Sequence, residues 1–179
     1  MDQSTPAGQD ALYAFLETAG IAYAHHEHPP LFTVADSQAL RGELPGLHIK
    51  NMFLREKKGG LWLVSCREDR EIRIRDLERE IGARNCSFGK PELLEEALGV
   101  KPGAVTPFAA LNDREGRVQV VLDRAIAEAE LVNAHPLHNE ATTGIAAADL
   151  LRFLEATGHP PRLVDFDRLE ALARERAGT

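Results

Sequence analysis

The chain has 179 residues, 44% of them hydrophobic, and a formal net charge of −7 at pH 7. This length suits one sizeable core, so we expect a single domain over 1–179. The negative charge argues against a protein that coats nucleic acid, because phosphate contacts supply most non-specific affinity. We find no apolar run long enough to span a membrane and no signal peptide near the first residue, which favours a cytoplasmic location.

The N-terminal residues predict a helix and then a strand. Leu12 and Leu16 share one face of a helix over about 8–18, and Gly20 ends that helix. The next strand is expected to begin near Ile21. Further along, Thr33 could cap a short helix that runs through residue 39.

A hairpin is the clearest pattern in the middle of the chain. Its first strand carries the apolar residues of 49–54, and its second is the run 61–66. Gly59 and Gly60 permit the tight turn between them.

The remaining residues mix helices and strands without regular alternation. The expected helices run over 74–81, 91–98, 148–157 and 167–177, and the expected strands lie near Val105 and over 118–123, 130–133, 142–145 and 162–166. This order indicates an α+β fold with a mixed or antiparallel sheet.

The segment 98–108, LGVKPGAVTPF, predicts a rigid bend. Pro102 and Pro107 restrict φ and lack amide donors, while Gly103 accepts backbone angles that a side chain would forbid. Amides on such a loop can hold a carbonyl or a phosphate. A plain helix-to-strand connection is the alternative, since Gly and Pro are common in ordinary loops.

Lys50 is the first candidate for a functional side chain. It alternates with the apolar residues of its strand and shares a face with Met52 and Leu54. A buried, unpaired ammonium is costly, so Lys50 should either extend to solvent or meet an anion.

Histidines form two short groups. His25, His26 and His28 make the first, and His135 and His138 make the second. Neither group has HExxH or Cys/His zinc spacing, so no metal is expected.

The two cysteines, Cys66 and Cys86, fit no zinc or redox spacing, and we interpret both as packing residues. A nucleophilic cysteine would need a nearby base and an electropositive setting, which the sequence does not provide.

Basic residues gather at the expected hairpin tip. Arg55, Lys57 and Lys58 are candidates for local contacts with a nucleic acid, and the arginines within 67–75 could extend them. Acidic residues interrupt this stretch, so a solvated face of mixed charge is the alternative.

Four segments carry a family resemblance. They are HIKNMFLRE at 48–56, LGVKPGAVTPF at 98–108, NDREGRVQVVLD at 112–123 and AHPLHNEATTG at 134–144. In this order they resemble the YbaK-type aminoacyl-tRNA editing family, and within it the free-standing bacterial prolyl-tRNA editing proteins. The resemblance implies a curved, barrel-like mixed sheet surrounded by helices. It also implies a cytoplasmic deacylase of mischarged tRNA(Pro), with alanine as the wrong amino acid.

The resemblance and the local chemistry together define the expected site. Lys50 matches the family's functional lysine, which implies contact with the terminal adenosine or its phosphate, and 135–139 matches an HPxxN pattern. Glu140 departs from the hydroxyl that many relatives carry after the asparagine. The expected catalytic residues are Lys50, Gly103, Thr106 and His138, and the expected substrate-binding residues are His28, Leu31, Val34, Asn51, Phe53, Pro107, His135 and Asn139.

The expected reaction is attack of water on the aminoacyl ester, with the oxyanion held by amides of 103–106 and no cofactor. A pocket for a methyl side chain could use Leu31, Val34 and Phe53 to exclude proline, although ordinary core packing explains these residues equally well. The expected partners are mischarged tRNA, with prolyl-tRNA synthetase or an elongation factor as further candidates, and the expected state is a monomer.

Three other functions stay open from the sequence. One is a deacylase that prefers Cys-tRNA(Pro), and another is a non-catalytic module that binds aminoacyl-tRNA or a synthetase. The third is a hydrolase of another small aminoacyl conjugate.

Overall fold

The structure is a computed structural model that describes residues 5–30, 35, 36, 39 and 44–178. Its helices are α1 (Gln9–Thr18), α3 (Ile74–Ile81), α4 (Pro91–Leu98), the 3-10 helix η1 (Pro107–Asn112), α5 (Arg124–Glu128), α6 (Ala147–Ala156) and α7 (Phe166–Ala177). Its strands are β1 (Tyr23–Glu27), β2 (Leu47–Glu56), β3 (Leu61–Arg67), β4 (Cys86–Phe88), β5 (Val118–Asp123), β6 (Leu131–Ala134), β7 (Ala141–Ala146) and β8 (Arg162–Val164). None of the helices within these residues is long and apolar enough to cross a membrane.

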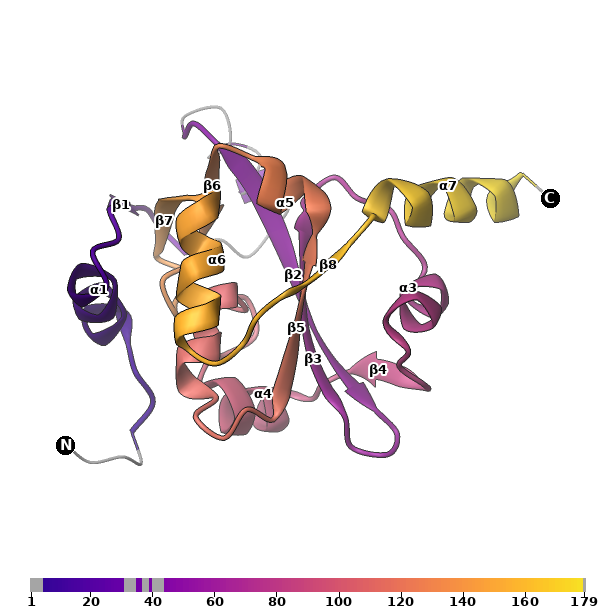
Figure 1. Cartoon of the computed structure of the whole chain (residues 1–179), viewed down its shortest axis with the longest axis horizontal. Coiled ribbons are helices and arrows are strands. Elements are labelled where there is room, and N and C mark those ends of the chain that lie inside the picture. Colours follow the sequence, from indigo (N-terminus) through magenta and orange to yellow (C-terminus); the bar gives the residue numbers. More distant parts are fainter. Residues whose placement is uncertain (1–4, 31–34, 37–38, 40–43, 179) are drawn as a thin grey trace.

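The strands form one mixed sheet in the order β1-β7-β6-β2-β3-β5-β8. The pairs β2·β6, β3·β5 and β5·β8 are parallel, and the pairs β1·β7, β6·β7 and β2·β3 are antiparallel. This mixed sheet with helices around it confirms the predicted fold class (Figure 1).

Strand β2 joins the two halves of the sheet, because it changes partner along its length. Leu47 and His48 pair with β6, the residues from Ile49 to Arg55 pair with β3, and the last residues pair with the short strand β4. Lys50 therefore lies just beyond the point where β6 leaves β2.

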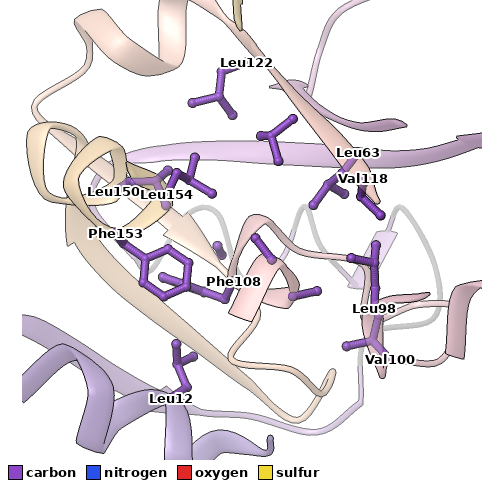
Figure 2. Close-up of a cluster of buried hydrophobic side chains, with 14 of the residues drawn as sticks. Leu12, Leu63, Leu98, Val100, Phe108, Val118, Leu122, Leu150, Phe153 and Leu154 are labelled. Atoms are coloured by element: carbon purple, nitrogen blue, oxygen red, sulfur yellow. The ribbon is translucent and has the colours of Figure 1, made fainter. Parts of the chain in front are cut away.

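Alternation along β2 separates two clusters of buried side chains. Phe53 belongs to the larger cluster, in which α1, α4, η1 and α6 pack on the sheet, and Leu54 belongs to the smaller cluster beneath α3 and α7. Figure 2 shows the larger cluster, where Phe108 and Phe153 pack edge to face with ring centroids 5.3 Å apart. Leu12 of α1 also contributes to this core.

The helices also separate along the longest axis of the molecule. Figure 1 shows α1 at one end and α3 and α7 at the opposite end. Surfaces near α1 and near α3 are therefore far apart.

Most of the predicted elements are confirmed. Helices α3 and α4 have the predicted bounds because Gly82 and Gly99 end them with a positive φ. The strand expected near Ile21 begins at Tyr23, after Ile21 has bonded back to the last turn of α1.

The strand expected near Val105 is wrong. Residues there lead into η1, whose first residue Pro107 has a fixed φ and no amide donor for a ladder. Most of the expected Thr33–Ala39 helix, Thr33 included, lies outside the described residues.

Candidate active site

The α1 end of the molecule contains a cavity of about 900 Å³. The start of α1 forms one wall, β1 forms another, and the segment from His138 to Ala141 closes it. The side chains that give this cavity its polar character are Gln9, Asp10, His25, Glu27, His28, His138 and Glu140. The structure thus brings together two of the predicted site residues, His28 and His138, and the unusual Glu140.

His138 is held by both of its ring nitrogens. Its Nδ1 accepts a hydrogen bond from the Glu140 amide at 3.1 Å, which leaves Nε2 to donate to Gln9 Oε1 at 2.6 Å. A neutral imidazole satisfies both bonds. Gln9 was not identified from the sequence, because its position at the first turn of α1 gives no sign of a contact with residue 138.

His28, just after β1, and His135, just after β6, lie beside each other with ring centroids 6.2 Å apart. His28 Nε2 lies 2.8 Å from the Thr142 hydroxyl, and its Nδ1 lies 2.9 Å from the Pro29 carbonyl oxygen. His135 Nδ1 donates to the Ala141 carbonyl at 3.0 Å, because a carbonyl can only accept. Its Nε2 is therefore left as an acceptor in the neutral ring.

Burial lowers the pKa of His135 below its ordinary value. The bond to the Ala141 carbonyl acts in the opposite direction, and the nearby His28 and His138 add to the lowering. His135 is therefore a neutral acceptor near pH 7 and not a source of positive charge.

A second set of bonds on this side of the sheet involves Tyr13, which sequence reasoning missed. Its hydroxyl lies 2.7 Å from both His25 Nδ1 and Thr143 Oγ1. A tyrosine on the inner face of α1 was a usable signal, since a partly buried phenol needs a polar partner.

The loop predicted at 98–108 comes close to the segment around Asn139 at Gly103. Its φ is +89°, and a Cβ added there would lie 3.7 Å from Asn139 Nδ2, so the two predicted residues are neighbours. The Ala104 amide bonds to the Lys101 carbonyl. Within the described residues the amides of Gly103, Val105 and Thr106 donate to no other group.

Thr106 and Pro107 begin η1. The Thr106 hydroxyl is buried and accepts from the Phe108 amide at 3.3 Å, so it caps that helix. Pro107 occupies the first helical position, where no amide is needed. Both side chains therefore shape the loop, and Gly103 and Val105 are the residues of 103–106 that combine some exposure with an amide that has no partner among the described residues.

Lys50 lies apart from the cavity near α1. Its Nζ donates to the backbone carbonyl of Arg70. Extending the β2·β6 register by two residues brings Lys50 level with His135, where the two strands separate. Lys50 therefore lies on β2 near the end of β6, and His135 is the first residue after β6.

Two further predicted residues, Asn51 and Phe53, follow Lys50 on β2. Asn51 Oδ1 accepts from the Ser65 hydroxyl at 2.5 Å, and Phe53 is buried in the larger core cluster. The position of Phe53 fits the core interpretation. Leu31 and Val34 lie outside the described residues.

Arg70 is a structural residue, and the basic patch expected from the arginines of 67–75 does not include it. It is only 2% exposed, and its guanidinium forms two bonds with Asp123, at 2.8 and 3.2 Å. Glu170 of α7 accepts a further bond at 3.2 Å, and Asp167 accepts another. Arg70 therefore joins α7 to β5 and fixes the turn whose carbonyl holds Lys50.

The cysteines have the chemistry of packing residues. Burial raises the pKa of the Cys66 thiol to about 12 and that of Cys86 to about 11. A thiol with such a pKa is a poor nucleophile near neutral pH. Among the residues that the structure describes, no group of histidine, cysteine and carboxylate side chains is arranged to hold a metal ion.

Comparison with known proteins gives consistent results. The family model described as "Aminoacyl-tRNA editing domain" matches residues 28–153. Prolyl-tRNA synthetase associated domain-containing protein 1 of Danio rerio is 41% identical over 158 residues, which cover 87% of this chain and 86% of that protein. Prolyl-tRNA editing protein ProX of Acetoanaerobium sticklandii is 32% identical and covers 88% of this chain and 96% of its own.

A solved structure, that of the hypothetical protein APE2540, has the same fold. It superposes with a TM-score of 0.68 at 21% identity, covering 86% of this chain and 97% of its own.

Proposed function

Because this chain belongs to the aminoacyl-tRNA editing domain family, we propose that it hydrolyses the ester of mischarged tRNA(Pro), with Ala-tRNA(Pro) as its main substrate. The name of ProX, a prolyl-tRNA editing protein, supports the proline tRNA as the carrier. The protein is then a single editing domain that acts in trans on tRNA charged elsewhere, in the cytoplasm.

The observation that carries this proposal is the loop at Gly103, which lies beside Asn139 and has amides without a partner among the described residues. A tetrahedral intermediate at the ester carbon needs donors for its oxygen, and in this proposal the amides of Gly103 and Val105 provide them without a charged side chain. Gly103 has a positive φ, which glycine adopts without the strain that a side chain would cause, so this residue permits the turn. Since the loop is anchored by Pro107 in η1, its amides need little reorganisation during the reaction.

The nucleophile in this mechanism is water. The two cysteine thiols are poorly ionised, so covalent catalysis through them is disfavoured. His135 has a free Nε2 acceptor and a lowered pKa, and it can orient a water molecule or a ribose hydroxyl. His138 and Asn139 position the same segment of the chain.

Lys50 anchors the terminal adenosine or its phosphate in this proposal. Its ammonium has donors left after the bond to the Arg70 carbonyl, and it meets no carboxylate among the described residues. An anionic phosphate is the natural partner for a cation in this setting.

Discrimination follows from size. A synthetase pocket built for proline rejects the smaller alanine by only about 1–3 kcal/mol, so a second and smaller site is needed. Leu31 and Val34 remain the residues that we propose for this sieve, because the burial of Phe53 in the larger core cluster fits ordinary packing. Loss of discrimination against Pro-tRNA(Pro) in Leu31→Ala or Val34→Ala is the expected result, and unchanged discrimination would remove them from the sieve.

The decisive experiment compares ester hydrolysis of Ala-, Cys- and Pro-tRNA(Pro) and of Ala-tRNA(Ala) under single-turnover conditions. Wild-type protein is expected to act on Ala-tRNA(Pro) in preference to the others. Lys50→Met, which keeps the methylenes and removes the charge, should slow this reaction about 100-fold. Lys90→Met, at the exposed start of α4, is the matched control and should keep the wild-type rate.

Other outcomes separate the alternatives. Preferred hydrolysis of Cys-tRNA(Pro) would change the assigned amino acid. Hydrolysis that ignores the tRNA would indicate a general aminoacyl hydrolase. Binding of Ala-tRNA(Pro) without any turnover would overturn the proposal in favour of a non-catalytic module.

A further inference from the structure

Exposed arginines gather around α3, at the end of the molecule opposite to α1. Arg75 and Arg79 lie one turn apart on α3, and Arg84 follows that helix. The three line one surface cavity of about 1000 Å³. In the described part of the chain none of these side chains forms an ion pair or hydrogen bond, so their charge is available to a ligand.

The same surface continues onto the tip of the β2–β3 hairpin. The Lys57 amide donates to the Asn85 carbonyl at 3.2 Å, and the Arg84 amide donates to Glu56 Oε1 at 2.8 Å. The exposed side chains of Lys57 and Lys58 therefore adjoin the arginines of the α3 segment.

The carboxylates of this region have partners within the fold, and on α3 Asp76 pairs with Arg176 and Glu80 with Arg168. Glu78 Oε1 accepts from the Cys86 amide at 2.6 Å. Glu56 Oε2 accepts from Trp62 Nε1 at 3.0 Å. Lys57, Lys58, Arg75, Arg79 and Arg84 are left with no carboxylate partner among the described residues, although the whole chain carries a net charge of −7. Such a local excess of cations on an acidic protein indicates a specific anionic partner.

An exposed aromatic ring borders these cations. Phe88 ends the short strand β4 and is 65% exposed, which is unusual for a large apolar side chain. Its neighbour on the strand, Ser87, pairs with Arg55. Arginines bind phosphates through paired donors, and an aromatic ring stacks on a base or ribose, so the combination is typical of RNA contacts.

We infer that a basic surface, defined by Lys57, Lys58, Arg75, Arg79 and Arg84 and bordered by Phe88, binds the sugar-phosphate backbone of the tRNA body. The inference rests on the proposed function for the identity of the RNA. It extends the predicted tRNA contacts from the hairpin tip to α3 and β4. Because α1 and α3 lie at opposite ends of the molecule, only an extended polymer can occupy the candidate site and this surface together (Figure 1).

The test measures binding of uncharged tRNA(Pro) transcript by fluorescence anisotropy at several salt concentrations. Arg75→Gln with Arg79→Gln should raise Kd about ten-fold and reduce the salt slope by about 2, because each phosphate that an arginine neutralises contributes close to 1. Phe88→Ala should raise Kd about three-fold and leave the salt slope unchanged, since no charge is removed.

Matched controls use exposed side chains elsewhere. Arg124→Gln with Arg152→Gln removes two exposed arginines far from α3, and Leu163→Ala removes the other large exposed apolar side chain among the described residues. Both should bind tRNA(Pro) as the wild type does. Equal weakening in the control and α3 arginine variants would show a general charge effect and overturn the inference.

Single-turnover hydrolysis at saturating protein separates this inference from the proposed function. The α3 variant should hydrolyse bound Ala-tRNA(Pro) at the wild-type rate, because it affects binding alone. If wild-type protein hydrolyses no ester, the proposed function fails while the binding comparison still decides the surface. Unchanged tRNA affinity in the α3 variant, together with weaker binding of prolyl-tRNA synthetase, would assign the surface to a protein partner and overturn the inference.

Discussion

The two ends of the molecule use their polar side chains in opposite ways. At the histidine end, defined by His25, His28, His135 and His138 near α1, the rings bond to nearby hydroxyls, carbonyls and an amide. At the arginine end, near α3 and α7, one arginine is buried among carboxylates, whereas Arg75, Arg79 and Arg84 are exposed and have no ion pair with any described residue.

This contrast shows how burial decides the role of a charge. Arg70 is buried and fully paired, so it stabilises the fold. Arg79, on the helix that follows it, is exposed and forms no ion pair within the part of the chain that the structure describes, so its charge remains available for a ligand. The predictions below test how far the contrast holds, from the largest expected change in stability to the smallest.

The largest effect is expected from Asp123→Asn at the arginine end. The amide keeps the shape of the side chain but leaves the buried Arg70 guanidinium without its fully buried anion. The free energy of unfolding should fall by about 3–5 kcal/mol, measured by urea denaturation. Glu96→Gln, which breaks the exposed pair with Arg117, should cost at most about 1 kcal/mol. Similar losses in the two variants would contradict the structural role of burial.

A pair of glycines compares the packing of the two ends. A Cβ added at Gly89, after β4, would lie 2.5 Å from ring carbons of Phe53. Gly89→Ala should therefore cost about 1–3 kcal/mol through a displaced core ring. At the histidine end, a Cβ on Gly144 would have its nearest contact at 3.5 Å, with Asn133 Oδ1. Gly144→Ala should leave the urea midpoint almost unchanged. An equally small shift in Gly89→Ala would contradict this prediction, because it would show that β4 moves at little cost in stability.

Tyr13→Phe tests the bonds at the histidine end. Loss of the hydroxyl leaves His25 and Thr143 without this partner and should cost about 1 kcal/mol. Tyr23→Phe is the matched control, because its hydroxyl bonds only to the exposed Glu17 and its ring stacks on Tyr13 in the same way. Thermal unfolding should shift clearly in the first variant and hardly at all in the second.

Titration should distinguish the two ends by pH. The folded pKa of His135 lies below its unfolded value of about 6.5, so the unfolded chain takes up a proton first and stability falls as pH drops below that value. His135→Gln should reduce the decline between about pH 7 and pH 5. Arg70 lowers the pKa of Asp167, so that carboxylate stabilises the fold above about pH 4 and loses its contribution as pH falls further. Asp167→Asn should alter only this acid limb, and a change near pH 6 would contradict the assignment.

Much of the fold was predictable because strong local signals mark its elements. Pro91 begins α4, and Gly99 ends it with a positive φ, so both bounds followed from residue type. The strand β4 and the helix α5 gave no such signal. β4 has three residues and depends on pairing with β2, and α5 is a single short turn capped by Asp123.

The site was predictable where residues are close in sequence and less so where they meet through the fold. Gly103 and Asn139 were each identified, but their contact arises from tertiary packing. The role of Arg70 was missed because its carboxylates lie 53 to 100 positions away in the chain. Periodicity carries no information on such distant pairs.

The sheet order has a consequence for synthesis on the ribosome. The first described strand, β1, pairs with β7, which comes much later in the chain. The parallel pair β3·β5 can form only after α3, α4 and η1 have been synthesised, because they lie between β3 and β5. A nascent chain that has emerged through β5 therefore holds β1 without its partner, and Phe15 of α1 still lacks its edge-to-face contact with Phe153 of α6. Stable structure at the histidine end can form only when β7 and α6 have left the exit tunnel, so the candidate site is completed late in translation.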